Sequence, residues 1–365
     1  MPKDQNDHTI SNGPSFHANK SGAVNYQLPH IPYLRMRFSL LAQRDSHLPF
    51  FKGSLLRGAF GHALRRTVCV MGPQQPCETC LLRRQCAYPQ LFETFVEGEP
   101  PPFLRGLDTA PRPYVFEPFD QQQHYRAGES LRFDLLLFGK AIPLHPYAIY
   151  AVAQMASEGL GYKRFPFDLL KVEWQEGENK QQKEKGKQQE GDIEPRTATG
   201  EIEWRLLYDG ASKRLHENPS PQLVSAITHS TVSSAQITFQ TPTRLKFNNT
   251  LTSEFSFRML AFKMIRRVLE LAHFHLPGAS LDWEFHDLLT AANSVKITRR
   301  QLQWVDWERR SNRQNTEMKM GGFVGEIVLE GDLAPFIHLL RTCEIVHVGK
   351  GAVFGNGKIA CETAP

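Results

Sequence analysis

Apolar and polar residues follow the same sequence of patterns twice along this chain. Runs with an apolar residue at every second position predict strands, and apolar residues three or four apart predict amphipathic helices. The first half contains a strand, a helix, two strands, a helix and a strand, in the ranges Tyr33 to Leu41, about Gly53 to Val68, Tyr114 to Glu117, Leu131 to Phe138, Pro146 to Gly159 and near Leu170.

The second half repeats this order of elements. A β-α-β-β-α-β order is the ferredoxin-like arrangement. The pattern therefore predicts an α+β fold made of two tandem ferredoxin-like domains. The expected elements of the second half are Ala235 to Phe247, Glu254 to His273, Ser294 to Trp307, Phe323 to Glu330, Ala334 to Arg341 and Ala352 to Ala360.

The long helix of the second half has the clearest pattern. Its apolar residues recur at helical spacing, and Ser253 stands where an N-cap residue is expected. The apolar stripe consists of Phe257, Leu260, Met264, Val268 and Leu271.

Polar segments suggest where the domains begin and end. Residues 1–30 are polar and poor in aliphatic side chains, which is typical of a disordered tail. We expect the first domain at residues 31–225 and the second at residues 226–365. Inside the first domain, the low-complexity segment 175–200 lies between two strand-like runs, and this favours an elongated, solvated hairpin loop.

Composition limits the possible classes of protein only broadly. The hydrophobic share of 41% is that of an ordinary soluble protein, and no apolar run is long enough to span a membrane. Met1 to Lys20 is polar and shows no secretory signal, so we expect a cytoplasmic protein without a membrane partner. The net charge of +5 permits nucleic-acid binding without requiring it.

A glycine-rich loop between the last helix and the last strand is the most informative motif. Glycines in a loop let backbone N–H groups approach phosphate closely, and neighbouring lysines add positive charge. The spacing fits neither a Walker A loop nor a dinucleotide-binding turn, so we expect a polymeric phosphate ligand, and a plain glycine turn is the alternative. The residues concerned are Gly349, Lys350, Gly351, Gly355, Gly357 and Lys358.

Several strings of residues resemble a known family. In the second half they are Phe239-Gln-Thr-Pro-Thr-Arg-Leu-Lys246, Glu308-Arg-Arg-Ser-Asn-Arg-Gln314, Met320-Gly-Gly-Phe-Val-Gly-Glu-Ile-Val-Leu-Glu-Gly331 and the glycine loop. In the first half they are Leu48-Pro-Phe-Phe-Lys-Gly-Ser-Leu-Leu-Arg-Gly-Ala-Phe-Gly-His62 and Arg112-Pro-Tyr-Val-Phe-Glu-Pro118.

Over residues 31–361 these strings resemble CRISPR-associated endoribonucleases of the RAMP (repeat-associated) superfamily, which process precursor CRISPR RNA. The resemblance implies ferredoxin-like folds and a C-terminal glycine-rich loop. It also implies CRISPR repeat RNA as substrate, other CRISPR effector subunits as candidate partners, and cleavage without a catalytic metal. A non-catalytic subunit of the same superfamily that holds guide RNA is the competing class.

The first helix has an apolar face and an opposite basic face that contains two glycines. Glycine inside a helix costs about 1 kcal/mol relative to alanine, so a close neighbour is expected there. RNA backbone and the glycine loop of the second domain are both candidates, and a plain helix–sheet contact with solvated arginines is the alternative. The basic face consists of Arg57, Gly58, Gly61, His62, Arg65 and Arg66.

RNA cleavage without a metal needs a base for the 2′-hydroxyl, an acid for the 5′-oxygen and positive charge on the phosphorane. The products would be a 2′,3′-cyclic phosphate and a 5′-hydroxyl. Histidine titrates in the right range, and His62 is our first candidate and His47 our second. Lys52 or Arg57 would supply positive charge. His347, beside the glycine loop, fits a structural role equally well.

Four cysteines lie close together at Cys69, Cys77, Cys80 and Cys86. In a chain without an export signal this density favours metal binding over disulfides. Structural zinc is the leading interpretation, and an iron–sulfur cluster is the alternative. Four thiolates leave no open coordination position for catalysis. Cys343 and Cys361 are expected to be buried thiols.

A second basic region joins the second and third strands of the last half. Arginines interleaved with tryptophans suit phosphate contact and base stacking, whereas a solvated hairpin tip is the alternative. Its residues are Arg299, Arg300, Trp304, Trp307, Arg309, Arg310, Arg313 and Lys319, and Arg244 and Lys246 extend the same RNA-binding set.

Overall fold

The computed structural model of the protein describes residues 26–72, 74–99, 101–104, 107, 109–177, 203–224, 231–306, 308–311 and 316–364. Most of the expected tail (1–30) and hairpin loop (175–200) lies outside these ranges, as do Trp307 and Arg313. Within the described ranges, no helix combines the length and apolarity that crossing a membrane requires.

The first sheet runs in the order β3-β5-β1-β6-β7-β8, and all neighbouring strands are antiparallel. Two further strands of two residues each, β2 and β4, pair with each other beside it. The elements are β1 (Tyr33–Ala42), β2 (Ser46–His47), α1 (Gly53–Val68), β3 (Tyr114–Pro118), β4 (His124–Tyr125), β5 (Ser130–Phe138), α2 (His145–Glu158), β6 (Phe167–Gln175), β7 (Trp204–Asp209) and β8 (Arg214–Leu215).

The second sheet runs in the order β12-β15-β9-β16 and is also antiparallel. Two hairpins, β10–β11 and β13–β14, accompany it. The elements are β9 (Ser234–Thr243), β10 (Leu245–Phe247), β11 (Thr250–Thr252), α3 (Phe257–His275), α4 (His286–Ala291), β12 (Lys296–Val305), β13 (Glu308–Ser311), β14 (Thr316–Lys319), β15 (Gly322–Glu330), α5 (Ile337–Val346) and β16 (Ile359–Ala364).

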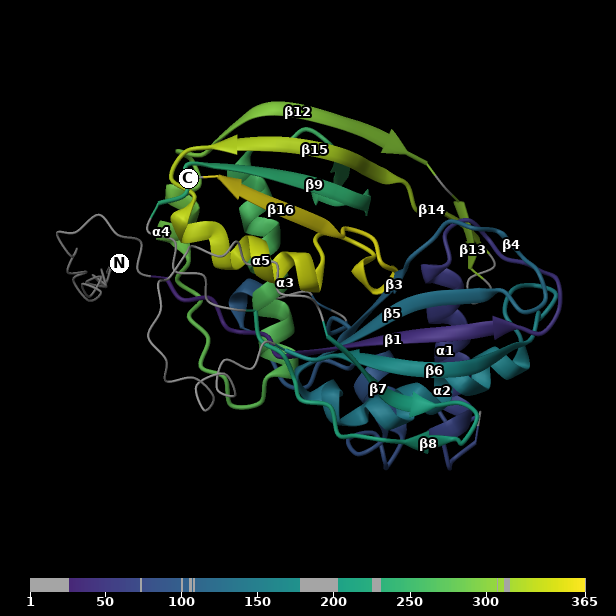
Figure 1. Cartoon of the computed structure of the whole chain (residues 1–365). Coiled ribbons are helices and arrows are strands. Elements are labelled where there is room, and N and C mark those ends of the chain that lie inside the picture. The colour runs from purple at the N-terminus through teal and green to yellow at the C-terminus, as the bar shows by residue number, and fades with distance from the viewer. Residues whose placement is uncertain are drawn as a thin grey trace, which may run out of the picture.

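Both sheets confirm the tandem ferredoxin-like architecture. In each, the four strands of the β-α-β-β-α-β unit lie in the order second, third, first, fourth. In Figure 1 the second sheet arches over α3 and α5, and the first sheet lies below them. The side chains of α1 and α2 share one apolar core with the first sheet, and those of α3 and α5 share another with the second.

The two domains meet on the strands β3 and β5. Phe116 and Leu135 belong to the core under α1 and α2, whereas Val115 and Leu136 belong to the core of the second domain. Because successive side chains of a strand point to opposite faces, these two strands are buried on both sides. One face of the first sheet therefore packs against α1 and α2, and the opposite face of β3 and β5 packs against the second domain.

Three expected boundaries are wrong, and each has a local cause. The N-cap of α3 is Ser256 rather than Ser253, because the Ser256 side chain accepts a hydrogen bond from the Met259 N–H. The strand expected over 235–247 is interrupted at Arg244. The last strand begins at Ile359 rather than Ala352, because Ala352–Phe354 forms a turn of 3-10 helix inside the glycine loop.

Candidate functional site

The glycine loop, residues 347–358, is a docking element between the domains. Gly349, Gly351, Gly355 and Gly357 all have positive φ, from 74° to 87°, a conformation that costs other residues energy. A Cβ on Gly355 would stand 2.6 Å from the carbonyl oxygen of Phe116 in β3. Figure 1 shows this loop, in yellow, beside β3. The glycines thus permit close packing of protein on protein.

The first helix meets the same loop at its N-terminal end. A Cβ on Gly53 would lie 1.7 Å from the carbonyl oxygen of Phe354, so only glycine fits there. The two glycines that the sequence singled out behave differently. Gly61 is buried against the ring of Phe92, and Gly58 has open space around it. The close approach of the helix to the glycine loop is therefore made by Gly53.

Most backbone donors of the glycine loop bond within the protein. The Lys350 N–H donates to the Arg244 carbonyl at 3.0 Å, and the Gly357 N–H donates to the Pro242 carbonyl at 3.1 Å. The N–H groups of Phe354 and Gly355 donate to carbonyls of the loop itself. What the loop presents to solvent is the exposed side chain of Lys350.

A buried carboxylate fastens the loop to the first domain. Glu117 of β3 is 2% exposed and accepts hydrogen bonds from His347 Nε2 at 2.9 Å, Arg35 Nη1 at 2.6 Å and Lys358 Nζ at 2.7 Å. Burial alone would raise the pKa of Glu117, but the bond from His347 and the charges of Arg35 and Lys358 hold it well below its usual range. Burial lowers the pKa of His347. His347 therefore has a structural role.

His47, the second catalytic candidate, stands next to another histidine. The rings of His47 in β2 and His124 in β4 have centroids 4.5 Å apart, and both residues are exposed. Lys52, immediately before α1, is 1% exposed, and its Nζ lies 3.1 Å from a carboxylate oxygen of Asp120. Burial lowers the pKa of Lys52, although Asp120 opposes this. The Lys52 ammonium is therefore a partner of Asp120 rather than an open cation.

The four predicted catalytic residues fall into separate places. His62 is exposed on α1, ten residues after Lys52, which is about 15 Å along a helix at 1.5 Å per residue. The Arg57 guanidinium lies 4.0 Å from the centroid of the Phe92 ring and 5.8 Å from that of Phe354, so it connects the helix to its neighbours. Lys52 directly precedes Gly53, the residue of α1 that meets the glycine loop, whereas His47 lies on β2 and His62 lies further along α1.

Two predicted RNA-binding arginines of α1 have partners within the protein. Arg65 Nη2 donates to the Gln75 carbonyl at 3.0 Å, and Arg66 forms an ion pair with Glu158 of α2. Both contacts fasten α1 to adjacent segments.

A basic cluster, defined here as Arg244, Lys246, Lys263 and Lys350, lies where β10, α3 and the glycine loop meet. Burial lowers the pKa of Lys350, and the charges of Lys246 and Arg244 lower it further. Burial likewise lowers the pKa of Lys263, the charges of Arg266 and Lys350 lower it further, and that of Glu270 opposes them. In the described part of the chain, none of these four cations forms an ion pair with a carboxylate. Sequence reasoning missed Lys263, because its α3 position looks like an ordinary solvated face.

The second predicted basic region is divided between a strand and a hairpin, because Arg299 and Arg300 lie on β12 of the second sheet. Arg309 and Arg310 lie on β13, and Lys319 ends the paired strand β14. Trp304 of β12 is 40% exposed and donates from its indole nitrogen to Asp306 at 2.8 Å. Trp304 is therefore available at the surface.

The four clustered cysteines follow α1 in a segment of turns. Cys77 and Cys86 are partly buried against the first core. Burial raises the pKa of both thiols. Over the described residues, no three His, Cys, Asp or Glu side chains are arranged to hold a metal ion. Zinc and the iron–sulfur cluster stay predictions. Cys343 and Cys361 are buried, as predicted.

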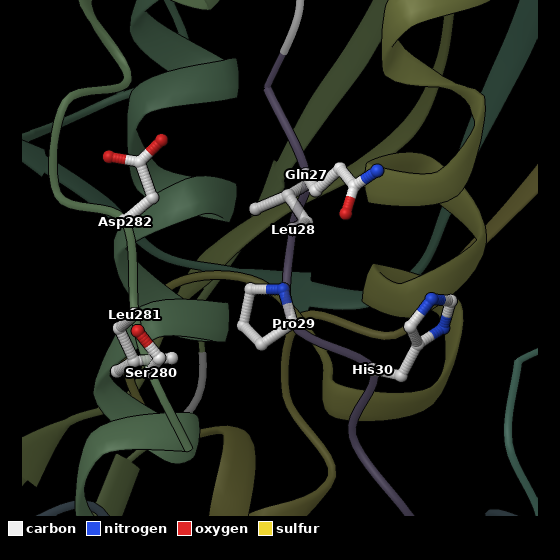
Figure 2. A pocket seen from close by; sticks show the side chains of 7 residues that line it. All are labelled: Gln27, Leu28, Pro29, His30, Ser280, Leu281 and Asp282. Carbon is white, nitrogen blue, oxygen red and sulfur yellow. The ribbon is translucent and has the colours of Figure 1, made fainter.

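A shallow depression lies elsewhere, between the segment before β1 and the segment after α3 (Figure 2). None of the predicted catalytic or RNA-binding residues lines it. Its lining consists of Gln27, Leu28, Pro29, His30, Ser280, Leu281 and Asp282.

Two family models match the chain, one in each of its two domains. Residues 31–197 match the AF_1859_N family model, described as an N-terminal domain. Residues 237–359 match the model described as CRISPR-associated endoribonuclease Cas6. No curated protein sequence matches the chain.

Solved structures of low sequence identity share the fold. A product complex of Thermus thermophilus Cas6 is 14% identical with a TM-score of 0.50, covering 91% of this chain and 99% of that one. A Cas6-RT-Cas1–Cas2 complex is 12% identical with a TM-score of 0.50, covering 92% of this chain and 29% of that one.

The chain thus has two tandem ferredoxin-like domains, and solved Cas6 structures share its overall fold. Residues 237–359 match the CRISPR-associated endoribonuclease Cas6 model, and this match supports a Cas6-type, RNA-cleaving enzyme.

Proposed function

We propose that this protein cuts precursor CRISPR RNA within its repeats, without a metal ion, by attack of a 2′-hydroxyl on the adjacent phosphate. The products would be a 2′,3′-cyclic phosphate and a 5′-hydroxyl. The observation that carries this proposal is the placement of His47. It is an exposed histidine in a pair, on the short strand β2 that precedes α1.

We place His47 ahead of His62 as the proton-transfer residue. An exposed imidazole exchanges protons with a bound substrate, and His47 shares its surroundings with a second ring. His62 is exposed on α1, about 15 Å along the helix from Lys52. Lys52 acts as a positioning residue in this proposal, since its buried ammonium holds Asp120, whose carboxylate also accepts from the Tyr125 hydroxyl at 2.9 Å.

The basic cluster is the proposed grip on the RNA backbone. The cations of this cluster repel one another, and a polyanion removes that repulsion by neutralising them together. The Phe247 ring lies 4.8 Å from Lys263 Nζ, so a base could stack beside the phosphate contacts. Arg309, Arg310, Arg313 and Lys319 are proposed to add further contacts to the RNA backbone.

Partners follow from the same proposal. The similar solved structures include a Cas6 product complex and a Cas6-RT-Cas1–Cas2 complex. We propose CRISPR repeat RNA as the substrate of this chain, and other CRISPR proteins as its partners.

The test incubates the purified protein with end-labelled repeat RNA in excess EDTA. We expect cleavage at one position, and the 5′ fragment should resist 3′-end ligation until its cyclic phosphate is removed. Binding without cleavage would instead favour a non-catalytic guide-RNA subunit. His62→Ala is the matched control for His47→Ala, and equal loss in both variants would contradict the assignment of His47.

A further inference from the structure

His124 is the side chain at this end of the molecule that the proposed function has not used. It lies on β4, whose two residues pair with the two residues of β2. The register places Ser46 opposite Tyr125, and His47 opposite His124. Directly opposed residues of a ladder project on the same face. The two rings accordingly meet with their centroids 4.5 Å apart and their planes at 42°.

The buried face of this short ladder holds the histidines in place. Ser46 and Tyr125 are 5% and 1% exposed, and the Tyr125 hydroxyl donates to Asp120, the partner of Lys52. The Leu48 N–H extends the pairing by donating to the Gln123 carbonyl at 2.8 Å. The ladder is therefore anchored beneath the pair, and the histidines themselves are exposed.

The two imidazoles keep their nitrogens for a ligand. Among the described residues, neither the His47 nor the His124 ring forms a hydrogen bond with the protein. This contrasts with His347, whose two ring nitrogens contact Asn356 and Glu117, and with His275, whose Nε2 contacts Pro111. His347 and His275 are buried and bonded, whereas His47 and His124 are exposed and show no ring hydrogen bond among the described residues.

We infer that His124 is a catalytic residue that shares the proton transfers of RNA cleavage with His47. The inference rests on the proposed function. One ring in neutral form takes the proton of the 2′-hydroxyl while its oxygen bonds to phosphorus. The other ring, protonated, gives its proton to the 5′-oxygen as the P–O5′ bond breaks. The pair ends with the same number of protons on exchanged rings, and solvent restores the starting state.

A protonated imidazole of this pair would also supply the positive charge at the phosphate that the Lys52 ammonium does not. Lys52 is enclosed beside Asp120, so its ammonium has no direct path to a bound phosphate. One imidazolium and one imidazole side by side are the combination that the reaction needs.

The experiment compares His47→Ala, His124→Ala and the exposed control His216→Ala on two repeat RNAs. One RNA is natural at the cleaved phosphate, and the other carries a 5′-bridging sulfur there. A thiolate leaves without a proton, so this RNA removes the need for the acid and not for the base. On natural RNA we expect each of the first two variants to lose about 10²–10⁴-fold in single-turnover rate, with unchanged melting temperature and RNA affinity.

On the sulfur-containing RNA, one of the two single variants should recover nearly to the wild-type rate, and that variant identifies the acid. His124→Gln, which keeps the size of the side chain, should be as slow as His124→Ala on natural RNA. Cleavage of natural RNA by His124→Ala at the control rate would overturn the inference, and so would recovery of neither variant or of both. If the wild-type protein cleaves no repeat RNA, the proposed function itself fails.

Discussion

Replacing Glu117 by glutamine tests whether the carboxylate holds the two domains together. Glu117 is 2% exposed and is the shared acceptor of Arg35 in the first domain and of His347 and Lys358 in the second. Glutamine keeps the shape of the side chain but removes the charge. It also turns one acceptor into a donor that faces the cations.

The expected loss of stability is large for a single substitution. Removing one member of a buried ion pair typically costs about 3–5 kcal/mol, because the remaining charge is left buried and unpaired. Arg35 is 12% exposed and keeps Asp134 at 3.2 Å, and Lys358 is 30% exposed, so both retain some solvation or pairing. We therefore expect the lower end, about 3 kcal/mol in the free energy of unfolding.

The assay is urea unfolding at pH 7, followed by intrinsic fluorescence, with Glu254→Gln as the control. Glu254 is 82% exposed and pairs with Arg300, so its loss should cost less than about 1 kcal/mol. Combining Glu117→Gln with Lys358→Met should cost less than the sum of the two single changes, because the partners interact directly. A loss of less than about 1 kcal/mol for Glu117→Gln, or strict additivity with Lys358→Met, would refute the reasoning.

The pH dependence has a definite sign. The folded pKa of Glu117 is depressed, so its contribution is fully present above the unfolded value of about 4.3 and is lost as the pH falls below it. Below about pH 4.3, the free energy of unfolding of the wild-type protein should fall more steeply with decreasing pH than that of Glu117→Gln.

Three further predictions concern packing, RNA binding and metal. Gly53→Ala should weaken the contact with the glycine loop and slow repeat cleavage, whereas Gly58→Ala, with open space around it, should stabilise α1 by about 1 kcal/mol. Thermal melts should show a lower melting temperature for Gly53→Ala and a higher one for Gly58→Ala, and the reverse order would contradict this prediction. Lys350→Ala should weaken RNA binding and reduce the slope of log K against log salt by about 0.7, the value for one contact to single-stranded phosphate; an unchanged slope means that Lys350 touches no phosphate. Purified protein should contain about one zinc per chain, or absorb near 400 nm if the cluster is iron–sulfur, and Cys80→Ser should lose that content; elemental analysis that finds neither metal in the wild-type protein contradicts the cysteine prediction.

Local patterns in the sequence were sufficient for the order of elements. The apolar stripe of α3 and the alternating strands need only neighbouring residues to be recognised, and the tandem ferredoxin-like fold follows from that order. Ends of elements were less secure where several capping residues compete. Ser253 and Ser256 both precede α3, and only the folded geometry shows that the Ser256 side chain caps the helix.

The candidate site depended on contacts that no sequence pattern contains. His47 and His124 are far apart along the chain and come together because two-residue strands happen to pair in register. Lys52 was expected to be an open cation, yet burial beside Asp120 makes it a structural partner. Glu117 gave no signal at all, since a single glutamate in an apolar strand says nothing about the three cations that surround it.

The sequence by itself determined that the last segment is a glycine loop of unusual conformation, because only glycine tolerates positive φ at little cost. What those glycines approach was decided by the tertiary structure. Their missing side chains make room for Phe116 and other backbone of the protein, so the loop fastens one domain to the other. Close packing depends on both the glycine loop and the backbone that it meets, and the sequence of the loop does not show which backbone that is.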